Sequence, residues 1–373
     1  MKPLIKTAIA FLHLIYAILK IFPAKKKIVF LSRQANAPSL DFQMLSDRIL
    51  QMHPDYRTVM LCRMLQKTPK GMVGYCFHML RQMYHLATSR AAILDSYCIP
   101  ISLLKHKKTL LVIQMWHSVG TMKKFGYSIL DQPEGSSSEI AHLMKMHHGY
   151  DYVLAAGEGY KDHLAEGFCF DRSRILTYPL PRLELLQDPA YISDCRRKIT
   201  VAYPVIQQKK NLVYVPTFRK GEDAAFRQAL NDLIEAIDLT AYNLIVKAHP
   251  LAEFNSSDPR IICDTEYSSM EMLCVADAVI SDYSCIIYEA AVLKKPLYFY
   301  TYDYAQYMSK RDIYIDFKKE MPGPICDTAA ELAQALSAKY YDYVKLEQFL
   351  NRYVEVTGNE TENIVNLIFD HIS

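Results

Sequence analysis

The sequence predicts an α/β protein with two doubly wound domains, each a parallel sheet covered by helices. The chain has 373 residues, and hydrophobic cores tend to split into separate domains beyond roughly 250 to 300 residues. Short apolar runs rich in β-branched and aromatic residues alternate with helical patterns along the chain, as they do in βαβ units. Strands that are almost wholly apolar are typical of sheets buried on both faces.

The first domain is predicted over residues 26–190. Its strand-like runs lie at 26–32, 91–97, 109–116, 151–157 and 174–179. Helical patterns such as LDFQMLSDRILQMH and GMVGYCFHMLRQMYHLAT separate the runs. The Met- and aromatic-rich stripe of the second pattern is interpreted as core-facing, with a second membrane contact as the alternative.

A more polar stretch, residues 191–210, is predicted to connect the two domains. The second domain is predicted over residues 211–340, with strand-like runs at 211–217, 242–249, 277–282 and 296–303. Residues 341–373 are predicted to form C-terminal helices that could pack back on the first domain.

The composition argues against several classes of protein. The formal net charge is +3, far less basic than a nucleic-acid-binding domain, so no nucleic acid partner is expected. The nine cysteines include no C-x-x-C pair, which indicates reduced thiols with neither disulfides nor a zinc site. We expect neither a metal nor a cofactor, because D-x-D is absent and His142, His147 and His148 are not spaced to share one helix face.

The N-terminal residues 1–25 are predicted to form an amphipathic helix that associates with a membrane. The run from Thr7 to Phe22 is about 16 residues long, shorter than the ~20 residues of a spanning helix. Lysines precede and follow it, as in helices that lie against anionic lipid. A short span and a buried first helix are the alternatives, and a removable signal peptide is not expected.

Unusual polar residues follow four of the predicted strands. The segments are QMWHSVGTMKK (114–124), VPTFRK (215–220), KAHP (247–250) and SDYS (281–284). Ligands of open parallel sheets bind outside the carboxyl ends of the strands. We therefore expect these segments to form one phosphoryl-transfer site, in which two imidazoles and a guanidinium meet around a pyrophosphate.

The residue types suggest a role for each side chain. His117 is a candidate general base, because imidazole titrates close to working pH; a histidine that only caps a strand end is the alternative. Arg219 offers a planar fork for phosphate oxygens, and Thr217 and Lys220 add donors. His249 is a candidate for holding a diphosphate oxygen or for protonating the departing group.

The fourth segment is predicted to start a helix. Ser284 and the unpaired N–H groups of a helix start would complete a phosphate cradle, while Asp282 would orient a donor or a ligand hydroxyl. The loop PEGSSSE (133–139) is interpreted as a mobile lid near the His117 segment, on the acceptor side.

Several of these segments resemble the CDP-glycerol glycerophosphotransferase family, whose members add or polymerise glycerol or ribitol phosphate in teichoic-acid synthesis. The similar segments are QMWHSVGTMKKFGY (114–127), VPTFRK, KAHP, SDYSCIIYEAAVLKKPLYFYTYDYAQY (281–307) and DFKKEMPGPICDT (316–328). They occur in order and cover most of the chain after residue 100. The block at 281–307 is the most specific of them.

The resemblance implies a GT-B-like fold, with two Rossmann-type domains that face each other, and attachment to the cytoplasmic face of the bacterial membrane. It also implies transfer of glycerol phosphate from CDP-glycerol to a hydroxyl of a lipid-linked diphosphate saccharide, with release of CMP. CDP-ribitol as the donor is the alternative.

The resemblance also assigns residues. His117 and His249 correspond to the suspected catalytic pair of the family, and Arg219, Asp282 and Ser284 to residues that bind the donor. We extend the donor-binding set to Thr217, Lys220, Ser281 and Cys285, and assign the acceptor to Trp116, Ser118, Thr121, Lys123 and Lys124.

This sequence departs from the family pattern in places. Ser118 and Cys285 stand where many members have glycine and serine, and YPLPR (178–182) replaces a G-x-P-R turn. Two rival hypotheses stay open at this point. One is a glycosyltransferase or epimerase that uses a nucleotide sugar, and the other is a membrane scaffold without activity.

Overall fold

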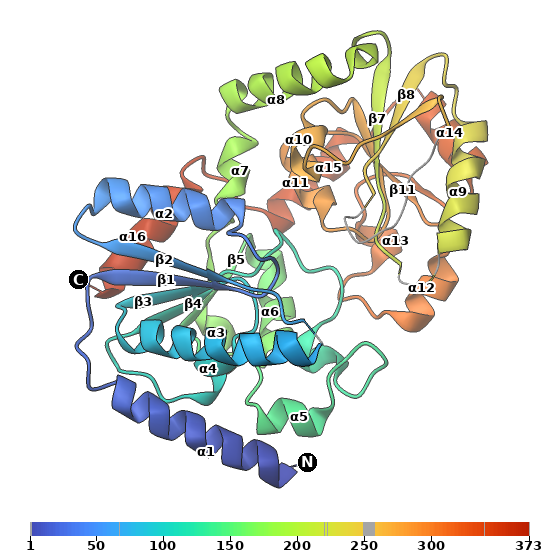
Figure 1. The fold of residues 1–373 in the computed structure, drawn as a ribbon. Helices are drawn as coiled ribbons and strands as arrows, with labels where there is room; N and C mark the ends of the chain where they lie inside the picture. Colours follow the sequence, from blue (N-terminus) through green and yellow to red (C-terminus); the bar gives the residue numbers. More distant parts are fainter. Residues whose placement is uncertain are drawn as a thin grey trace. The chain divides into compact units, whose positions relative to one another are not determined.

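The computed structural model describes residues 2–66, 68–219, 221, 223–248, 258–338 and 340–372. The chain divides into two compact units (Figure 1). The first unit consists of Met1–Ser118, Phe125–Arg182 and Thr357–Ser373, and the second of Val119–Lys124 and Leu183–Val356. The boundary thus falls earlier than the predicted residue 190, and part of the segment that carries His117 belongs to the second unit.

The first unit is built on a parallel six-stranded sheet. Its strands are β1 (Lys27–Ser32), β2 (Arg57–Cys62), β3 (Ala91–Leu94), β4 (Leu111–Gln114), β5 (Tyr152–Ala155) and β6 (Ile175–Thr177). Their order is β2-β1-β3-β4-β5-β6, with β1 paired in parallel to both β2 and β3. The chain passes from β1 to β2 on one side and then crosses to β3 on the other, so the strand order reverses between β1 and β3.

Helices cover both faces of this sheet. The helices are α1 (Lys2–Leu19), α2 (Leu40–Met52), α3 (Pro69–Ala87), α4 (Ile99–Leu103), α5 (Ser138–Leu143), α6 (Lys161–Phe168) and α16 (Glu360–Ile372), and α7 (Arg182–Leu185) begins at the unit boundary. Helices α2 and α16 lie on one face, and α3 and α4 lie on the other (Figure 1). The side chain of Ser39 caps α2 by accepting from the N–H of Phe42, and α2 buries Phe42, Leu45 and Ile49.

The second unit repeats the architecture. Its strands are β7 (Lys210–Val215), β8 (Tyr242–Val246), β9 (Ile261–Cys263), β10 (Ala278–Ser281), β11 (Leu297–Tyr300) and β12 (Ile325–Cys326), in the order β12-β11-β10-β7-β8-β9. Its helices are α8 (Pro189–Ala202), α9 (Asp223–Ala236), α10 (Ser269–Leu273), α11 (Ile286–Val292), α12 (Tyr304–Lys310), α13 (Phe317–Glu320), α14 (Ala329–Ser337) and α15 (Tyr343–Tyr353). Leu230 and Leu233 of α9 and Leu332 of α14 pack in one core cluster with Leu244 of β8. The strand order reverses here between β7 and β10.

The strands absent from the sequence prediction, β2, β9 and β12, all lie at the edges of the two sheets. Edge strands are often short or only half-buried, and their apolar signal is correspondingly weak. Strand β2 is half-exposed along most of its length, and β12 has only two residues. The predicted connection over 191–210 is largely the helix α8, which packs against α10.

The predicted C-terminal helices go to different units. Helix α15 stays with the second unit, where Phe349 stacks on Tyr288 at 5.2 Å. Helix α16 packs on α2 of the first unit, where Phe369 stacks on His53 at 3.4 Å. After Arg182 the chain therefore returns to the first unit only at Thr357, just before its last helix.

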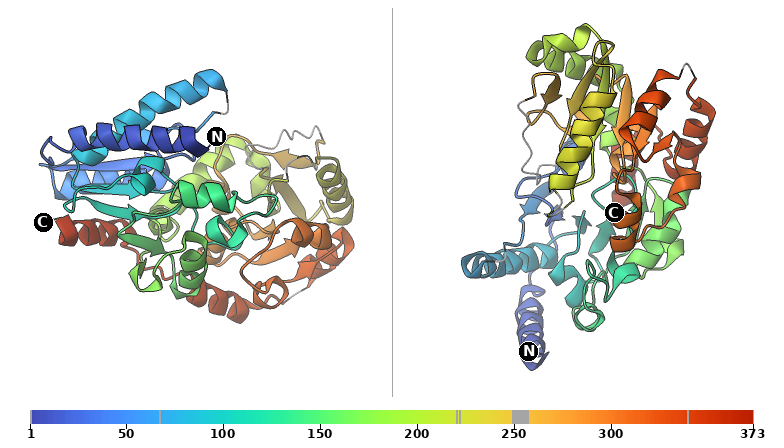
Figure 2. Two further views of the ribbon diagram at one scale, coloured as in Figure 1. Left: turned by 90° about the horizontal axis from the view of Figure 1, so that it is seen from below. Right: turned by 90° about the vertical axis from the view of Figure 1, so that its right-hand side faces the viewer.

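Helix α1 lies against α3 in the first unit (Figure 2). Tyr16 is buried, and its hydroxyl is 2.6 Å from Nδ1 of His106. The opposite face of α1 is exposed and apolar, with Phe11 and Leu14 each 61% exposed. None of the helices in the described part of the chain is both long enough and apolar enough to cross a membrane.

Candidate active site

Predicted site residues follow strands at or next to the two points where strand order reverses. In the first unit the reversal lies between β1 and β3, and His117 follows β4, the neighbour of β3. Gln34 and Asp95, which were not predicted, follow β1 and β3. In the second unit the reversal lies between β7 and β10, which are followed by the predicted Thr217 and Asp282. Such points are the usual ligand sites of open α/β sheets.

His117 is held as a neutral imidazole. Its Nδ1 lies 3.2 Å from the main-chain oxygen of Asp95 and 3.2 Å from the side-chain amide of Gln34. The Asp95 carbonyl can only accept and the Gln34 NH₂ group can only donate, so the tautomer of His117 decides which of the two is bonded to Nδ1. When Nδ1 carries the proton and donates it to Asp95, Nε2 keeps its lone pair. Burial lowers the pKa of His117 to about 4, and the nearby positive charge of Arg182 acts in the same direction. The ring is thus unprotonated at neutral pH, as a general base must be.

Arg182 fixes the main chain at His117. Its guanidinium and its main-chain N–H both donate to the carboxylate of Asp41, with Nε 2.9 Å from Oδ2 and N 2.9 Å from Oδ1. A further N–H donates to the main-chain oxygen of His117 at 3.3 Å. Asp41 is buried, so a planar fork on a desolvated carboxylate holds the histidine segment in place.

Asp95 is a buried carboxyl group beside the imidazole. Burial raises the pKa of Asp95 to about 6, and hydrogen bonds from Ser32 and Ser96 oppose that rise. Its Oδ1 has no hydrogen-bond partner among the described residues. A buried acceptor of this kind is costly, and this cost is typical of functional sites.

Trp116 has a backbone conformation that is strained for a bulky residue, with φ of 63°. Its ring lies 4.5 Å from Phe125 and 5.2 Å from Phe168. Gly167 makes this packing possible, because a Cβ there would come within 2.4 Å of the Phe125 ring. The aromatic packing offsets the backbone strain at Trp116. In this conformation the Trp116 ring lies beside His117, with 4.3 Å between the two rings.

A cavity of about 300 Å³ opens beside this aromatic group. Its lining includes Gln34, Ser96, Tyr97, Trp116, Phe125, Glu134, Gly135, Ser136 and His147. The predicted lid 133–139 therefore contributes directly to the cavity wall. Polar groups over an aromatic floor suit a hydroxylated ligand such as a sugar or an alditol.

The other predicted acceptor residues are distributed over both units. Ser118 ends the segment Met1–Ser118 of the first unit, whereas Thr121, Lys123 and Lys124 belong to the second unit. Lys124 pairs with Asp312 at 2.6 Å. Lys123 forms a bridge to Ile313, and burial lowers its pKa although Cys285 and Asp282 favour its charged form. The structure thus groups Lys123 with the predicted donor residues.

Arg219 is enclosed by protein carboxylates. It pairs with Asp282 at 2.9 Å and donates to both oxygens of Asp303, while a further N–H donates to the main-chain oxygen of Thr217 at 2.8 Å. Burial acts to lower the pKa of Arg219, but Asp282 and Asp303 outweigh it and raise the pKa. Its N–H groups point at the protein, so in this conformation Arg219 ties together the loops after β7, β10 and β11.

Tyrosine rings surround the same guanidinium. Its carbon lies 4.9 Å from the centre of Tyr302 and 5.6 Å from the centres of both Tyr283 and Tyr307. Tyr283 and Tyr307 stack on each other at 3.8 Å. Cation–π contacts of this kind strengthen when water is excluded, so the cage holds the arginine firmly.

The remaining predicted donor residues have distinct positions. Ser281 is buried and donates to the main-chain oxygen of Val215 at 2.9 Å, which links β10 to β7. Asp282 accepts from the N–H of Thr217 at 2.9 Å. The buried Oγ1 of Thr217 has no partner among the described residues, and so it is a candidate to bind a ligand.

Ser284 and Cys285 are half-exposed at the start of α11. The thiol of Cys285 lies 3.3 Å from the main-chain oxygen of Gly120. These positions agree with the predicted helix start after β10. Lys220 and His249, the other predicted site residues, lie outside the described residues.

Metal coordination finds no support within the described ranges, where no three His, Cys, Asp or Glu side chains group as ligands. Of the three clustered histidines, His147 is buried with Nδ1 3.0 Å from the Tyr150 hydroxyl, whereas His142 and His148 are exposed.

Comparison with known proteins decides the family. The family model for CDP-Glycerol:Poly(glycerophosphate) glycerophosphotransferase matches residues 14–370. The chain belongs to this family. Among curated members, a teichoic acid ribitol-phosphate primase of Bacillus spizizenii is 31% identical, with 92% of this chain and 90% of that protein covered. A teichoic acid glycerol-phosphate primase of Bacillus subtilis is 29% identical, with 79% and 77% covered.

Solved structures share the fold of this glycerophosphotransferase family member. The wall teichoic acid polymerase TagF has a TM-score of 0.75 at 20% identity, over 96% of this chain and 93% of that chain. A UDP-GlcNAc 2-epimerase of Methanocaldococcus jannaschii has a TM-score of 0.57 at 14% identity, over 94% of this chain and 100% of that chain. The predicted family, the GT-B-like α/β fold and the CDP-alditol phosphotransferase class in teichoic-acid synthesis are confirmed.

Sequence reasoning missed residues that support the predicted ones. They are Gln34, Asp41, Asp95, Arg182, Asp303 and the tyrosines around Arg219. Asp95 and Asp303 lie inside the predicted runs 91–97 and 296–303, whereas the structure ends these strands at Leu94 and Tyr300. Shorter predicted strands would have set both residues at strand ends. Arg182 and Asp41 are 141 residues apart in the chain, and no local pattern links them.

Proposed function

We propose that this protein transfers glycerol phosphate from CDP-glycerol to a hydroxyl of a lipid-linked diphosphate saccharide. The observation that carries the proposal, beyond membership of the family, is the neutral His117 after β4, one strand from the strand-order reversal of the first unit. In the tautomer whose Nδ1 donates to the Asp95 carbonyl, Nε2 is left to accept a proton. This is the state that a general base for a hydroxyl group requires.

The proposed reaction forms one P–O bond and breaks another. The acceptor oxygen attacks the phosphorus that bears glycerol, and its proton passes to Nε2 of His117. The bond between that phosphorus and the bridging oxygen breaks, and CMP leaves with the bridging oxygen. In-line displacement of this kind depends mainly on positioning and on charge stabilisation.

The second unit supplies the proposed donor residues. Thr217 offers a buried hydroxyl without a partner among the described residues, and the start of α11 offers main-chain N–H groups beside Ser284. Lys123 adds a cation close to Cys285 and Asp282. We assign Arg219 to this donor set as the group that holds these loops. His249 remains in the proposal as a second catalytic histidine, on the family resemblance alone.

The cavity of about 300 Å³ is lined by Trp116 and Gln34, which both contact His117, and it is proposed to hold the end of the acceptor. Its aromatic side chains can stack on a sugar ring while Gln34, Glu134 and Ser136 bond hydroxyl groups. An acceptor that ends in a sugar or alditol hydroxyl would thus be held by residues that contact the imidazole.

We further propose that α1 attaches the protein to the cytoplasmic face of the bacterial membrane. The outer face of α1 exposes Phe11, Leu14 and Ile18, and that of α3 exposes Val73 and Phe77, the latter 70% accessible. Exposed apolar faces of this size on two packed helices mark interaction surfaces. A lipid-linked acceptor would be met at such a surface.

CDP-ribitol is the second candidate donor. The ribitol-phosphate primase of Bacillus spizizenii matches a larger share of this chain than the glycerol-phosphate primase of Bacillus subtilis does, 92% against 79%. The identities of the two proteins to this chain differ little, at 31% and 29%.

The test combines the purified protein with a synthetic lipid-diphosphate saccharide and either CDP-glycerol or CDP-ribitol. We expect CMP release and a product heavier by one alditol phosphate, whose mass identifies the alditol. Release of UDP from a UDP-sugar, with no reaction of either CDP-alditol, would overturn the proposal.

A further inference from the structure

A second cavity, of about 410 Å³, lies at the opposite edge of the first sheet from His117. Arg90 precedes β3, Leu111 begins β4, Tyr152 begins β5 and Arg174 precedes β6, so the cavity lies at the amino ends of these strands. The C-terminal end of α16 contributes His371. Neither the family nor the candidate active site gives a role to this end of the sheet.

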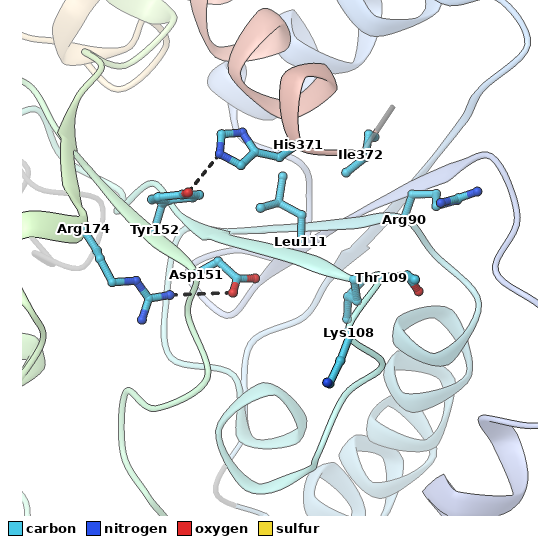
Figure 3. A pocket seen from close by; sticks show the side chains of 10 residues that line it. Arg90, Lys108, Thr109, Leu111, Asp151, Tyr152, Arg174, His371 and Ile372 are labelled. Carbon is cyan, nitrogen blue, oxygen red and sulfur yellow. Dashed lines mark hydrogen bonds and ion pairs between the residues drawn. The ribbon is translucent and has the colours of Figure 1, made fainter.

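The charge of this amino-edge pocket is predominantly positive. Arg90, Lys108 and Arg174 line it, against the single carboxylate of Asp151. Figure 3 shows Arg174, Lys108, Arg90 and His371 on different sides of the pocket. Asp151 is already engaged, because Oδ2 accepts from the N–H of Val112 at 2.7 Å and Oδ1 lies 3.7 Å from Arg174. At least two positive charges are therefore left for a ligand.

Part of the lining is held in place before any ligand arrives. Arg174 donates to the main-chain oxygen of Tyr150 at 3.0 Å and lies over the ring of Phe170 at 5.1 Å. His371 has Nδ1 2.9 Å from the main-chain oxygen of Leu367 and Nε2 2.9 Å from the hydroxyl of Tyr152 (Figure 3). The hydroxyl and the imidazole thus form a fixed polar wall of the pocket, which the exposed side chain of Lys108 also lines.

We propose that the amino-edge pocket binds a phosphate group, either of a soluble phosphate ester or of an anionic lipid headgroup. Arginine forks and a lysine ammonium group are the usual partners of phosphate oxygens. The cavity has room for a phosphate with a small polar substituent. Among its lining residues Tyr152 carries an aromatic ring, whose hydroxyl is bonded to His371.

The lipid source is reachable because the loop that carries Lys108 also holds the end of α1. Lys20 donates to the main-chain oxygen of Lys105 at 3.0 Å, and the ammonium of Lys107 contacts the main-chain oxygen of Phe22. The pocket is therefore joined by a few residues to the helix that exposes Phe11 and Leu14. The binding itself depends on neither the proposed transfer reaction nor the state of His117.

The test compares two double charge reversals in the full chain. Lys108→Glu with Arg90→Glu changes the pocket, and Lys105→Glu with Lys25→Glu changes exposed lysines of the same edge that do not line it. The single variant Lys108→Glu serves if the first double variant does not fold. Inorganic phosphate and glycerol phosphate are titrated calorimetrically at constant ionic strength, and the NMR signals of His371, assigned with His371→Gln, locate the binding.

Vesicles of phosphatidylglycerol and of phosphatidylcholine form the second arm. We expect the pocket variant to lose about fivefold or more in affinity for soluble phosphate or for phosphatidylglycerol vesicles, with the control variant close to the original protein. Loss for phosphate alone identifies a soluble ligand, and loss for phosphatidylglycerol alone identifies a lipid headgroup. The proposal is overturned if both variants bind both probes equally, or if phosphate leaves the His371 signals unmoved and vesicle binding is unchanged.

Discussion

Arg219 and Asp282 form a buried ion pair of 2.9 Å, with their side chains 4% and 0% exposed. The two residues follow different strands, β7 and β10, at the point where strand order reverses in the second unit. Asp303, after β11, completes the arrangement by a second contact with the same guanidinium. Three loops, two of which carry the predicted donor residues, are thereby joined by one cation.

Removing one member of this arrangement should destabilise the second unit. Asp303→Ala keeps the ion pair with Asp282 but removes the acceptor of two buried N–H groups of Arg219, and we expect the free energy of unfolding to fall by about 1 to 3 kcal/mol in urea titrations. Asp194→Ala is the matched control, since it removes an exposed pair with Arg197 and should change the free energy of unfolding by about 0.5 kcal/mol or less. Equal effects of the two substitutions would contradict the role of Asp303 in holding Arg219.

Loss of the imidazole of His117 should lower turnover without loss of structure. We expect His117→Ala to reduce kcat by about 10²-fold or more at saturating donor and acceptor, the usual contribution of a general base. His148→Ala, at an exposed position of the same unit, should leave kcat near its original value. A near-native rate of His117→Ala would exclude the base role.

The sequence predicts the central strands and the polar residues that follow them, but it does not predict the edge strands. The segments with His117, Arg219 and Asp282 were predictable, because rare polar residues directly follow long apolar runs. The edge strands β2, β9 and β12 were not, because one side of such a strand lacks a partner and its residues need not be apolar.

Long-range pairing also escaped prediction. Arg182 and Asp41 each look ordinary in the sequence, and only the fold brings them to His117. The split of Trp116 and Lys123 between two units was equally invisible, since nothing in the local pattern marks a unit boundary between residues 118 and 119. His249 remains a prediction on the family resemblance.

The stability of the first unit should fall as pH falls below neutral. Burial lowers the pKa of His85, His106 and His117 to about 4 each and that of His147 to about 3. The unfolded chain binds protons at these sites near pH 6.5, so stability is fully present above that pH and is lost as pH falls toward 4. Burial also raises the pKa values of Asp95 and Asp151, which works in the opposite direction, but these are two groups against the four histidines.

Urea titrations at a series of pH values measure this loss. His106→Gln, which removes one of the four histidines, should flatten the pH dependence, and His148→Ala should leave it unchanged. Stability that stays constant from pH 7 to pH 4.5 would show that the folded protein takes up protons at these histidines as readily as the unfolded chain does.

The hydroxyl of Tyr16 should hold helix α1 to the first unit. It lies 2.6 Å from Nδ1 of His106, and the other ring nitrogen is 3.1 Å from the main-chain oxygen of Ile101. Tyr16→Phe leaves Nδ1 buried without a donor, at a cost of about 1 to 3 kcal/mol. We expect faster hydrogen exchange confined to the amides of α1, and unchanged exchange there would contradict the anchoring role.

Charge on the outer face of α1 should weaken membrane binding without loss of fold. Phe11 and Ile18 are 61% and 56% exposed, so Phe11→Asp and Ile18→Asp remove apolar area from the surface that would enter the lipid and add a charge that must stay in water. Val201→Asp is the matched control, because Val201 is 75% exposed on α8 of the second unit. In vesicle co-sedimentation we expect about tenfold weaker binding for the α1 variants and none of that loss for Val201→Asp. Equal binding of all three variants would rule out α1 as the membrane contact, since each variant introduces the same charge and only its position differs.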